Sequence, residues 1–303
     1  MYKFSRIFTP IIVVRLYGGL GNQLFTYAAA RRLAYVNNCP LYIDTFSGFF
    51  RDKIYKRRYR LDSFRIKGKK HVLGIVIGLV KFFLGKHIEN KSLEYSFYNR
   101  RLIMPEHVSY DHRLLDFKIY QSLIFEGHWQ SEKYFEDIES VIRNELRFKS
   151  TIATYIEKLH KSIDISFSIA IHVRHFCRLD DLAKSNIDDY YYLKAIDYFR
   201  NKIENPTFFL FSDYPILAYN RLFNHSDNVI VVSDSFSFKD EVYELCFMSR
   251  FKYFIISNST YSWWGAWLSE YKDKIVVAPK TKIDSGETAW GFDGLIPDDW
   301  IKI

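Results

Sequence analysis

Hydrophobic positions in the first half of the chain form short apolar runs and one long segment with helical spacing. The runs at 11–16 and 41–44 predict two strands, because apolar residues dominate them and turn residues flank them. Between them, the alanine-rich segment 24–35 predicts a helix, so this part is a predicted βαβ unit. A further strand is expected at 119–125, and Ser131 is the expected N-cap of the helix that follows it.

The second half alternates regularly between short apolar runs and amphipathic segments. Strands are predicted at 168–173, 207–211, 229–232, 253–256 and 274–277, and helices at 155–161, 189–203, 216–223, 239–249 and 262–271. Such alternation predicts a parallel sheet with helices on both faces. We expect two domains, 1–163 and 164–303, with a boundary near 163–167.

Polar side chains follow two of these predicted strands. His172 and Arg174 lie two positions apart at the end of one strand, so both are expected to point to one face. An arginine there is suited to bind a phosphate through two hydrogen bonds, although an ordinary exposed strand end and a core histidine also fit. Ser212 and Asp213 end the next strand, where an aspartate suits a guanine, a ribose or a helix N-cap.

The most distinctive segment joins the strand at 253–256 to the following helix. It begins with four small polar residues, Ser257, Asn258, Ser259 and Thr260. Tryptophans follow at positions 263, 264 and 267. Ser259 or Thr260 can cap this helix, and the unpaired N–H groups of a helix N-terminus attract anions. Because ligands bind at the carboxyl ends of strands in open α/β sheets, a phosphate site fits this segment, as does a capped core helix packed by tryptophan.

A glycine-rich turn, Gly18-Gly19-Leu20-Gly21, joins the first predicted strand to the first helix. Glycines there let the backbone approach a phosphate, and the helix N-terminus favours its negative charge. The third glycine of the GxGxxG dinucleotide fingerprint is missing, but Asp44 ends the next strand, where a ribose-binding acid would lie. A phosphate-binding turn, a dinucleotide site and a purely structural tight turn all fit this pattern.

Composition and charge narrow the function. The chain has 303 residues, of which 48% are hydrophobic and 18% aromatic, enough for a sizeable core. Its formal net charge of +8 is spread along the chain and favours an anionic partner such as a nucleotide, a phosphoglycan or a membrane surface, whereas nucleic acid is not indicated. Three cysteines without a CxxC pair argue against a disulfide framework or zinc site. With no secretion signal, we expect a cytoplasmic protein.

One apolar segment, 72–85, is shorter than the about 20 residues that span a bilayer. Lysines at positions 67, 69, 70, 81 and 86 surround it. The segment fits a buried helix. It also fits an interfacial segment, in which residues 67–86 make peripheral contact with the anionic inner face of the plasma membrane through apolar contact and lysine attraction.

Four motifs together resemble the bacterial alpha-1,2-fucosyltransferase family, which is glycosyltransferase family 11-like. The motifs are GGLGNQLF at 18–25 with YA at 27–28, HVR at 172–174, FSD at 211–213 and SNSTYSWWGAWL at 257–268. Residues 127–135 and 297–300 are similar to further family segments, so the resemblance runs from about residue 13 to residue 300.

This resemblance implies an α/β GT-B-like fold, in which two Rossmann-like domains with parallel sheets face each other across a cleft. It implies an inverting transfer of L-fucose from GDP-β-L-fucose to a galactose 2-hydroxyl, without a metal or cofactor, in the synthesis of surface polysaccharide or O-antigen. The chain contains no Asp-x-Asp, the usual metal–diphosphate motif. Residues 1–163 would be mainly the acceptor side and 164–303 the GDP-sugar domain. The acceptor would be a galactose-containing oligosaccharide, expected to be lipid-linked.

The resemblance also implies roles for individual residues. Arg174 would hold the diphosphate, Asp213 would contact guanine or its ribose, and Asn22 would reach the donor from the facing domain. The tryptophans would anchor their loop rather than touch the sugar. The full set of expected substrate-binding residues is Gly19, Gly21, Asn22, Gln23, Arg178, Ser212, Asp213, Asn258, Ser259, Thr260 and Ser262.

The chain departs from the family pattern beside Arg174. His175 replaces a second arginine, and Phe176-Cys177 replaces Gly-Asp, so a cation beside the diphosphate is lost, which Arg178 can replace. Tyr214 stands where a second aspartate is common. These changes keep open another donor such as GDP-colitose, and also a catalytically inactive protein that binds a nucleotide or glycan.

An inverting displacement needs a base for the acceptor hydroxyl. The candidates are His172, Asp180 and Glu244, the last of which replaces the aspartate usual in the family. With Arg174, we expect His172 and Glu244 to form the catalytic group. A nucleotide-dependent oxidoreductase remains an alternative that rests on the glycine turn and Asp44.

Overall fold

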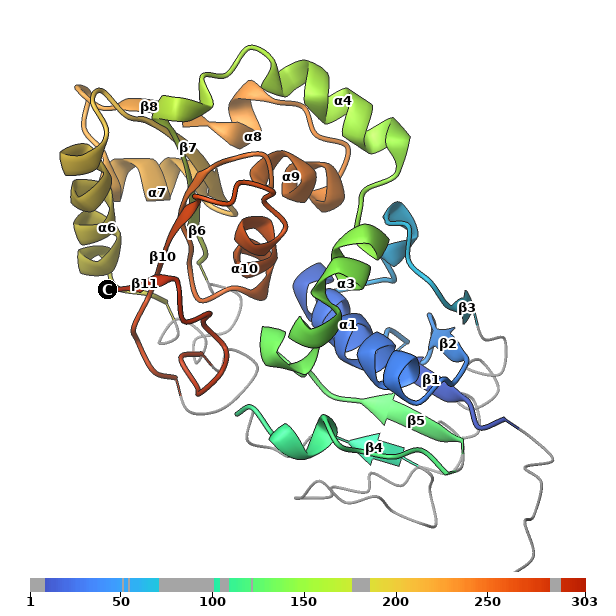
Figure 1. The fold of residues 1–303 in the computed structure, drawn as a ribbon. Coiled ribbons are helices and arrows are strands. Elements are labelled where there is room, and N and C mark those ends of the chain that lie inside the picture. The colour runs from blue at the N-terminus through green and yellow to red at the C-terminus, as the bar shows by residue number, and fades with distance from the viewer. Residues whose placement is uncertain are drawn as a thin grey trace, which may run out of the picture. The chain divides into compact units, whose positions relative to one another are not determined.

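The computed structural model describes residues 9–50, 52–53, 55–70, 101–103, 109–120, 122–175, 186–283 and 290–303. The chain divides into two compact units, Met1–Arg147 and Phe148–Ile303, and each is described by itself. Each unit is built on a parallel β-sheet with helices packed against it (Figure 1). This is the α/β class with two parallel sheets that the sequence predicts.

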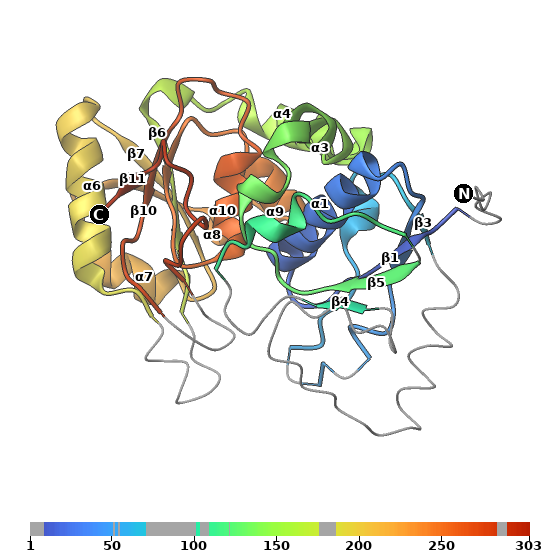
Figure 2. The same cartoon turned by 60° about the horizontal axis from the view of Figure 1, so that its bottom comes forward.

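In the first unit, the described residues form a five-stranded sheet in the order β3-β2-β1-β5-β4, with every neighbouring pair parallel. The strands are β1 (Ile12–Arg15), β2 (Leu41–Asp44), β3 (Lys69–Lys70), β4 (Arg101–Ile103) and β5 (Leu123–Glu126). Helix α1 (Leu20–Val36) connects β1 to β2 and lies over one face of the sheet (Figure 2). It packs closely because its fully buried Ala28, Ala29 and Ala30 add little bulk. A short helix, α3 (Glu139–Glu145), follows β5.

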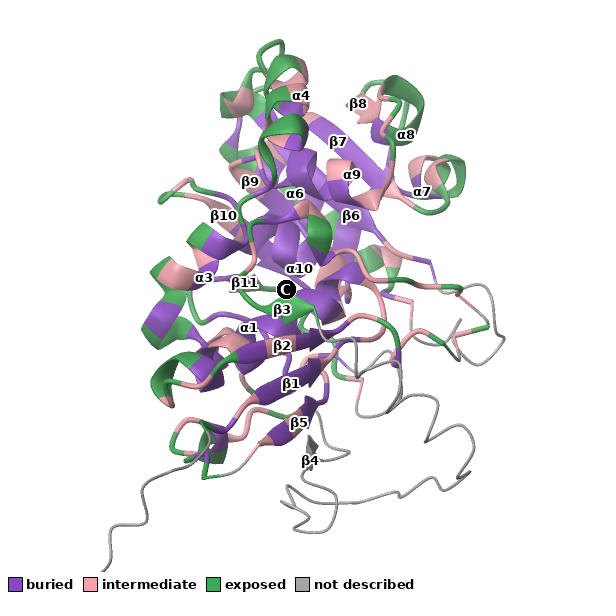
Figure 3. Ribbon diagram, turned by 90° about the vertical axis from the view of Figure 1, so that its right-hand side faces the viewer, coloured by how far each residue is buried: buried purple, intermediate pink, exposed green. Residues whose placement is uncertain are grey.

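In the second unit, the sheet within the described ranges has six parallel strands in the order β11-β10-β9-β6-β7-β8. The strands are β6 (Ser168–Val173), β7 (Thr207–Ser212), β8 (Asn228–Val231), β9 (Tyr253–Ile255), β10 (Ile275–Ala278) and β11 (Ile301–Lys302). All six residues of β6 are buried, and the centre of the sheet lies inside the unit (Figure 3). Because β6, β7 and β9 are parallel neighbours, the polar residues that follow them lie together at the carboxyl ends of the strands.

Helices cover both faces of this second sheet. They are α4 (Ser150–His160), α6 (Asp189–Lys202), α7 (Pro215–Leu222), α8 (Val232–Ser235), α9 (Glu241–Met248) and α10 (Thr260–Trp267). Helices α6 and α7 pack on one face, in a cluster that contains alternate residues of β6, such as Ile169 and Ile171. The opposite face is aromatic, since the ring of Phe209 meets those of Phe247 and Phe251 from α9 and the loop after it.

The structure shifts some predicted boundaries. The second unit begins at Phe148 rather than at residue 164, because α4 packs against α9 and so belongs with the second sheet. The helix predicted after Ser131 is divided into two 3₁₀ turns, Glu132–Tyr134 and Glu136–Ile138, and α3, and Ser131 is the N-cap of the first turn. The edge strands β3, β4 and β11 and the short α8 were not predicted, since two to four residues carry too little periodicity. Within the part of the chain that is described, no helix is both long and apolar enough to cross a membrane. The segment 72–85 lies outside the described residues.

Candidate functional site

The carboxyl ends of β6 and β7 bring Arg174 and Asp213 together. The register pairs Val173 with Ser212, so the residues that follow them, Arg174 and Asp213, are neighbours. Nη1 of Arg174 is 2.8 Å from Oδ2 of Asp213, and Oδ1 of Asp213 accepts a hydrogen bond of 3.0 Å from the backbone N–H of His175. The N-cap of α7 is Tyr214, without a side-chain cap, so Asp213 does not cap this helix. Ser212 accepts instead from the backbone N–H of Tyr214.

His172 is a buried residue that holds the neighbouring loop. Its Nδ1 lies 2.9 Å from Oγ of Ser257, in the loop that joins β9 to α10. Burial, and after it the charges of Arg174 and His175, lowers the pKa of His172 from 6.5 to about 3. The imidazole is therefore neutral at physiological pH and binds protons weakly. Its position supports the loop better than it supports a role as proton acceptor.

The β9–α10 loop has a buried inner part and a more open outer part. Ser257 and Asn258 are buried, whereas Ser259 and Thr260 are half-buried at the start of α10. Ser259 is the N-cap, accepting from the backbone N–H of Tyr261 at 3.3 Å, as the sequence predicts. Ser262 is fully buried, and its hydroxyl donates to the carbonyl of Ser259 at 3.2 Å. In this geometry Ser262 supports the cap, and its contact with a substrate stays a prediction.

The tryptophans of α10 anchor this loop. Trp263, Trp264 and Trp267 are at most 3% exposed, and Nε1 of Trp263 donates to the carbonyl of Leu295 at 2.9 Å. A Cβ atom placed on Gly265 would lie 2.4 Å from Sδ of Met248, so α10 approaches α9 as closely as a glycine permits. The prediction that the tryptophans anchor the loop is confirmed, and α10 is a capped core helix. Its N-terminus follows β9 and therefore lies at the carboxyl ends of the strands, as Arg174 does.

Glu244 of α9 has a pKa suited to proton transfer. Burial, and after it the charges of Glu241 and Asp213, raises the pKa of this half-buried carboxyl from 4.5 to about 7. The ring of Tyr261 lies near the ring of His172, at a centroid distance of 5.7 Å, and the hydroxyl of Tyr261 donates to the carbonyl of Glu241 in α9. Of the base candidates, Glu244 has a near-neutral pKa and His172 does not. Asp180 lies outside the described residues.

His175 stands where the family pattern has a second arginine. It is buried, its ring meets Tyr214 edge-on at 6.0 Å, and its Nδ1 has no hydrogen-bond partner among the described residues. Burial is the main cause that lowers the pKa of His175, so it supplies no full positive charge at neutral pH. Tyr214 is 42% exposed beside the ion pair of Arg174, a placement that the sequence did not assign. Arg178, Phe176 and Cys177 lie outside the described residues.

The glycine turn of the first unit is held by Gln23. Gly18 adopts a φ of +74°, which favours glycine, and its carbonyl accepts from Nε2 of Gln23 at 3.0 Å. Gln23 is 1% exposed and also bonds the backbone of Arg58 and Arg60, so it fixes the turn rather than presenting its amide outward. The closest atoms to a Cβ placed on Gly19 belong to Arg57, at 3.9 Å. This cation beside the turn was missed, since the segment 46–70 has no clear period.

Three further residues of the first unit, Gly21, Asn22 and Asp44, are candidates from the sequence. Oδ1 of Asn22 accepts from Nε2 of Gln130 at 3.0 Å, and Gly21 is buried in the first turn of α1. Asp44 is buried, and its carboxylate accepts from the N–H groups of Phe46 and Ser47 and from the Ser47 hydroxyl. Through these hydrogen bonds Asp44 orders the chain after β2. Because its carboxylate is already occupied, a ribose-binding role is disfavoured.

Anionic ligands at the second sheet would meet backbone and arginine donors. Within the described ranges, no group of three or more His, Cys, Asp or Glu side chains is placed to hold a metal ion. Among the described residues at the carboxyl ends of these strands, Arg174 and the N–H groups at the start of α10 attract negative charge.

Comparison with known proteins shows the family. The family model described as glycosyl transferase family 11 matches residues 79–303, which is more than half of the chain. The chain belongs to glycosyl transferase family 11. Family 11 membership makes the protein a glycosyltransferase and argues, with the bonds of Asp44, against the oxidoreductase alternative.

Two curated relatives of this family 11 chain come from Escherichia coli. An alpha-1,2-colitosyltransferase is 29% identical over 311 residues, covering 97% of this chain and 99% of the relative. The O-antigen biosynthesis glycosyltransferase WbnK is 26% identical over 312 residues, covering 95% and 99%. Both alignments span both units, so the similarity concerns the whole arrangement of elements.

A solved structure shares the fold. POFUT1 in complex with GDP-fucose has a TM-score of 0.53 and 14% sequence identity, covering 89% of this chain and 98% of that one. At this identity the comparison supports the fold alone. The expectation of a GT-B-like α/β fold is confirmed by this neighbour together with the two parallel sheets.

Proposed function

We propose that the protein is an inverting glycosyltransferase that moves L-fucose from GDP-β-L-fucose to the 2-hydroxyl of a galactose unit, forming an alpha-1,2 linkage. A second donor, GDP-colitose, is favoured by one specific observation, the similarity to an alpha-1,2-colitosyltransferase. The two sugars differ at carbon 3, where colitose lacks the hydroxyl of fucose. The acceptor is proposed to be a lipid-linked oligosaccharide of a surface polysaccharide or O-antigen.

The observation that carries this proposal is the ion pair of Arg174 and Asp213 beside the capped N-terminus of α10. A GDP-sugar offers a diphosphate, which suits the arginine and the helix N–H groups, and a guanosine, whose N–H and hydroxyl groups suit the carboxylate. Ser212, Asn258, Ser259 and Thr260 lie at the same edge and are proposed to line the donor site.

In the proposed reaction the acceptor oxygen attacks carbon 1 of the donor sugar while the bond from carbon 1 to the diphosphate oxygen breaks. Attack on the opposite face converts the beta donor into the alpha product. Arg174 and the N–H groups of α10 stabilise the charge that develops on the leaving GDP, so no metal or cofactor is proposed. Glu244, whose pKa is raised to about 7, accepts the proton of the acceptor hydroxyl.

The first unit is proposed to contribute mainly to the acceptor. Gly19, Gly21, Asn22 and Gln23 form or brace its glycine turn, and the nearby Arg57 adds a cation. A cytoplasmic enzyme is proposed, with residues 67–86 touching the anionic inner face of the membrane where a lipid-linked acceptor resides. Vesicle binding that survives exchange of Lys69, Lys70, Lys81 and Lys86 for Glu would contradict this contact.

The proposal is tested by incubating the protein with GDP-fucose or GDP-colitose and a galactose-terminated oligosaccharide. Release of GDP that depends on the acceptor supports it, and the faster donor assigns the sugar. Turnover of a UDP-sugar with neither GDP-sugar used would contradict it. Tight binding of GDP with no turnover on any acceptor would favour the inactive nucleotide-binding alternative.

A further inference from the structure

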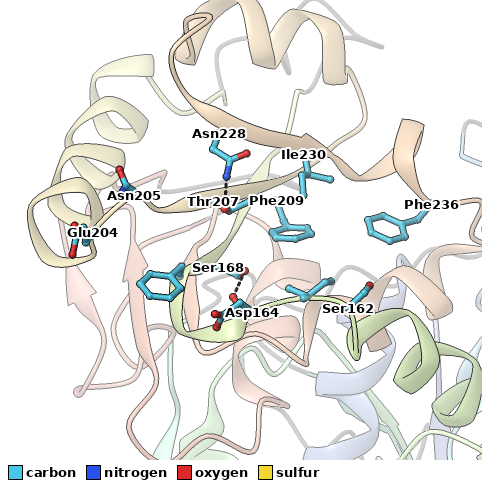
Figure 4. Close-up of a pocket in the computed structure, with 12 residues that line it drawn as sticks. Ser162, Asp164, Ser168, Glu204, Asn205, Thr207, Phe209, Asn228, Ile230 and Phe236 are labelled. Carbon is cyan, nitrogen blue, oxygen red and sulfur yellow. Dashed lines mark hydrogen bonds between the residues drawn. The ribbon is translucent and has the colours of Figure 1, made fainter.

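The second unit contains a hollow of about 540 Å³ that the proposed reaction does not use (Figure 4). It opens at the amino ends of β6, β7 and β8, where the sheet register aligns Ser168, Thr207 and Asn228. Arg174 and Asp213 follow the carboxyl ends of β6 and β7. A six-residue strand is roughly 17–20 Å long, so the hollow is separate from the proposed donor site at the carboxyl ends of the strands.

The floor of the hollow is apolar. Phe209 of β7 and Ile230 of β8 are paired neighbours on the same sheet face, and Phe236 lies beside them after α8 (Figure 4). The ring of Phe236 is held by contact with Phe247 at a centroid distance of 4.8 Å. Phe209 is buried beneath this surface, so a ligand would meet the half-buried Ile230 and Phe236 and the 43% exposed Phe167, which also lines the hollow.

The rim is polar and partly fixed. Oδ1 of Asp164 accepts from the N–H of Ser166, and the carbonyl of Asp164 accepts from the hydroxyl of Ser168 at 2.6 Å, which fixes one wall. On the other side, Nδ2 of Asn228 donates to Oγ1 of Thr207 at 2.6 Å, which orients the amide at the edge of the hollow. The rim therefore presents amide and carboxylate groups in defined positions.

Glu204 and Asn205 complete the rim from the loop between α6 and β7. Both are exposed, and Asn205 adopts a φ of +49°, as a tight turn requires. The Glu204 carboxylate has no hydrogen bond or ion pair within the described ranges. It is thus available to an incoming donor such as a hydroxyl group.

The charges of the lining select against anions. Asp164 and Glu204 are both acidic, and no Lys, Arg or His is among the described residues that line the hollow. A phosphate or nucleotide would be repelled here, in contrast to the carboxyl ends of the strands, where Arg174 lies. A ligand with an apolar face and many neutral hydroxyl groups matches both the floor and the rim.

We propose that this hollow binds a neutral sugar unit of a glycan chain, away from the reacting sugar. A pyranose places its C–H face on aromatic rings and its hydroxyls on carboxylates and amides. The choice of glycan rests on the proposed function: a galactose-containing acceptor or its elongated product. A chain held here has a raised local concentration near the enzyme, so longer acceptors would bind more tightly than short ones.

The test measures binding of a neutral galactose-containing oligosaccharide to the full chain by isothermal titration and by saturation-transfer NMR, without donor. The variant Glu204→Gln/Asn228→Ala removes two exposed rim groups, and Glu270→Gln is the matched exposed-acid control. We expect the rim variant to weaken binding of the long oligosaccharide at least fivefold, and to leave GDP affinity and turnover of a disaccharide acceptor unchanged.

Two comparisons keep this proposal apart from the proposed function. Arg174→Ala should lower transfer by about 10²-fold or more and leave binding of the long oligosaccharide intact. Binding of the oligosaccharide to a parent protein that transfers no sugar would contradict the proposed function and not the sugar site. Equal oligosaccharide affinity in the parent and the rim variant, or no binding to the parent at millimolar concentration, would overturn the sugar site while the transferase proposal stands.

Discussion

Nη1 of Arg174 lies 2.8 Å from Oδ2 of Asp213, and this ion pair joins the carboxyl ends of two adjacent strands. Both side chains are partly exposed, at 32% and 26%, so the pair adds little to stability, about 0–1 kcal/mol. Its effect is orientation: Asp213 also accepts from the N–H of His175, and so it holds the guanidinium in one place. In the proposed site, this fixes the cation before the diphosphate binds.

The first prediction concerns Arg174. Arg174→Ala should lower kcat by about 10²-fold or more, corresponding to about 3 kcal/mol, because the leaving diphosphate loses its cation. Stability should change little, since the ion pair is partly exposed. Steady-state kinetics and thermal unfolding check both parts, with Arg143→Ala of the first unit as a surface ion-pair control. Unchanged turnover would remove Arg174 from the mechanism.

The second prediction separates the cap of α10 from a phosphate contact. Ser259→Ala should lower the free energy of unfolding by about 1 kcal/mol. Ser259→Gly should lower it by only a few tenths of a kcal/mol, because glycine is a better N-cap than alanine. If the Ser259 hydroxyl also meets the diphosphate, both variants should weaken GDP binding to a similar degree. Chemical denaturation and GDP titration give the two values. GDP affinity that simply follows the loss of stability would leave Ser259 as a cap alone.

Glu244 supports a prediction about pH. Since burial raises the pKa of Glu244 to about 7, kcat should rise with pH up to about 7 and then level off as the carboxylate forms. Glu244→Gln should lose most activity and this pH dependence. A pH profile that is identical in parent and variant would contradict the base assignment.

The same group predicts a trend in stability. The pKa of Glu244 is raised above its usual 4.5, so its stabilising contribution is complete below that value and is lost as pH rises through about 7. The parent should therefore lose stability relative to Glu244→Gln over this range. Denaturant unfolding at pH 4.5 and pH 8 measures the difference, and a constant difference would argue against the shifted pKa.

His172 should behave differently. Because its pKa is lowered to about 3, it is uncharged throughout the working range, and His172→Asn should leave the shape of the pH–rate profile unchanged. Turnover should fall through loss of the bond to Ser257, which positions the loop. The stabilising contribution of neutral His172 is complete above pH 6.5 and is lost as pH falls toward 3. A shifted pH profile in the variant would restore His172 as a base.

The sequence predicts which side chains share the carboxyl ends of the second sheet, because strand periodicity decides it. The apolar runs fix β6, β7 and β9, and parallel strands place Arg174, Asp213 and Ser259 at one edge without further information. The capping preference of serine likewise predicts the start of α10.

Other features depend on contacts between distant residues. Ser262 and Gln23 look like ligand groups in the sequence, yet packing buries both and turns them to brace backbone turns. The raised pKa of Glu244 arises mainly from burial, then from Glu241 in the same helix and from Asp213, 31 positions away; the burial and the contribution of Asp213 depend on the fold. The hollow at the amino ends of β6–β8 is likewise formed by three separate loops.

The most direct test of the account is the anomeric configuration of the product. The purified protein would receive GDP-β-L-fucose or GDP-colitose with a galactose-terminated acceptor in the presence of a metal chelator, and the new linkage would be assigned by NMR. The account predicts an alpha-1,2 linkage and one GDP released for each sugar transferred, without added metal. A beta linkage, a requirement for a divalent ion, or no transfer from either donor would contradict it.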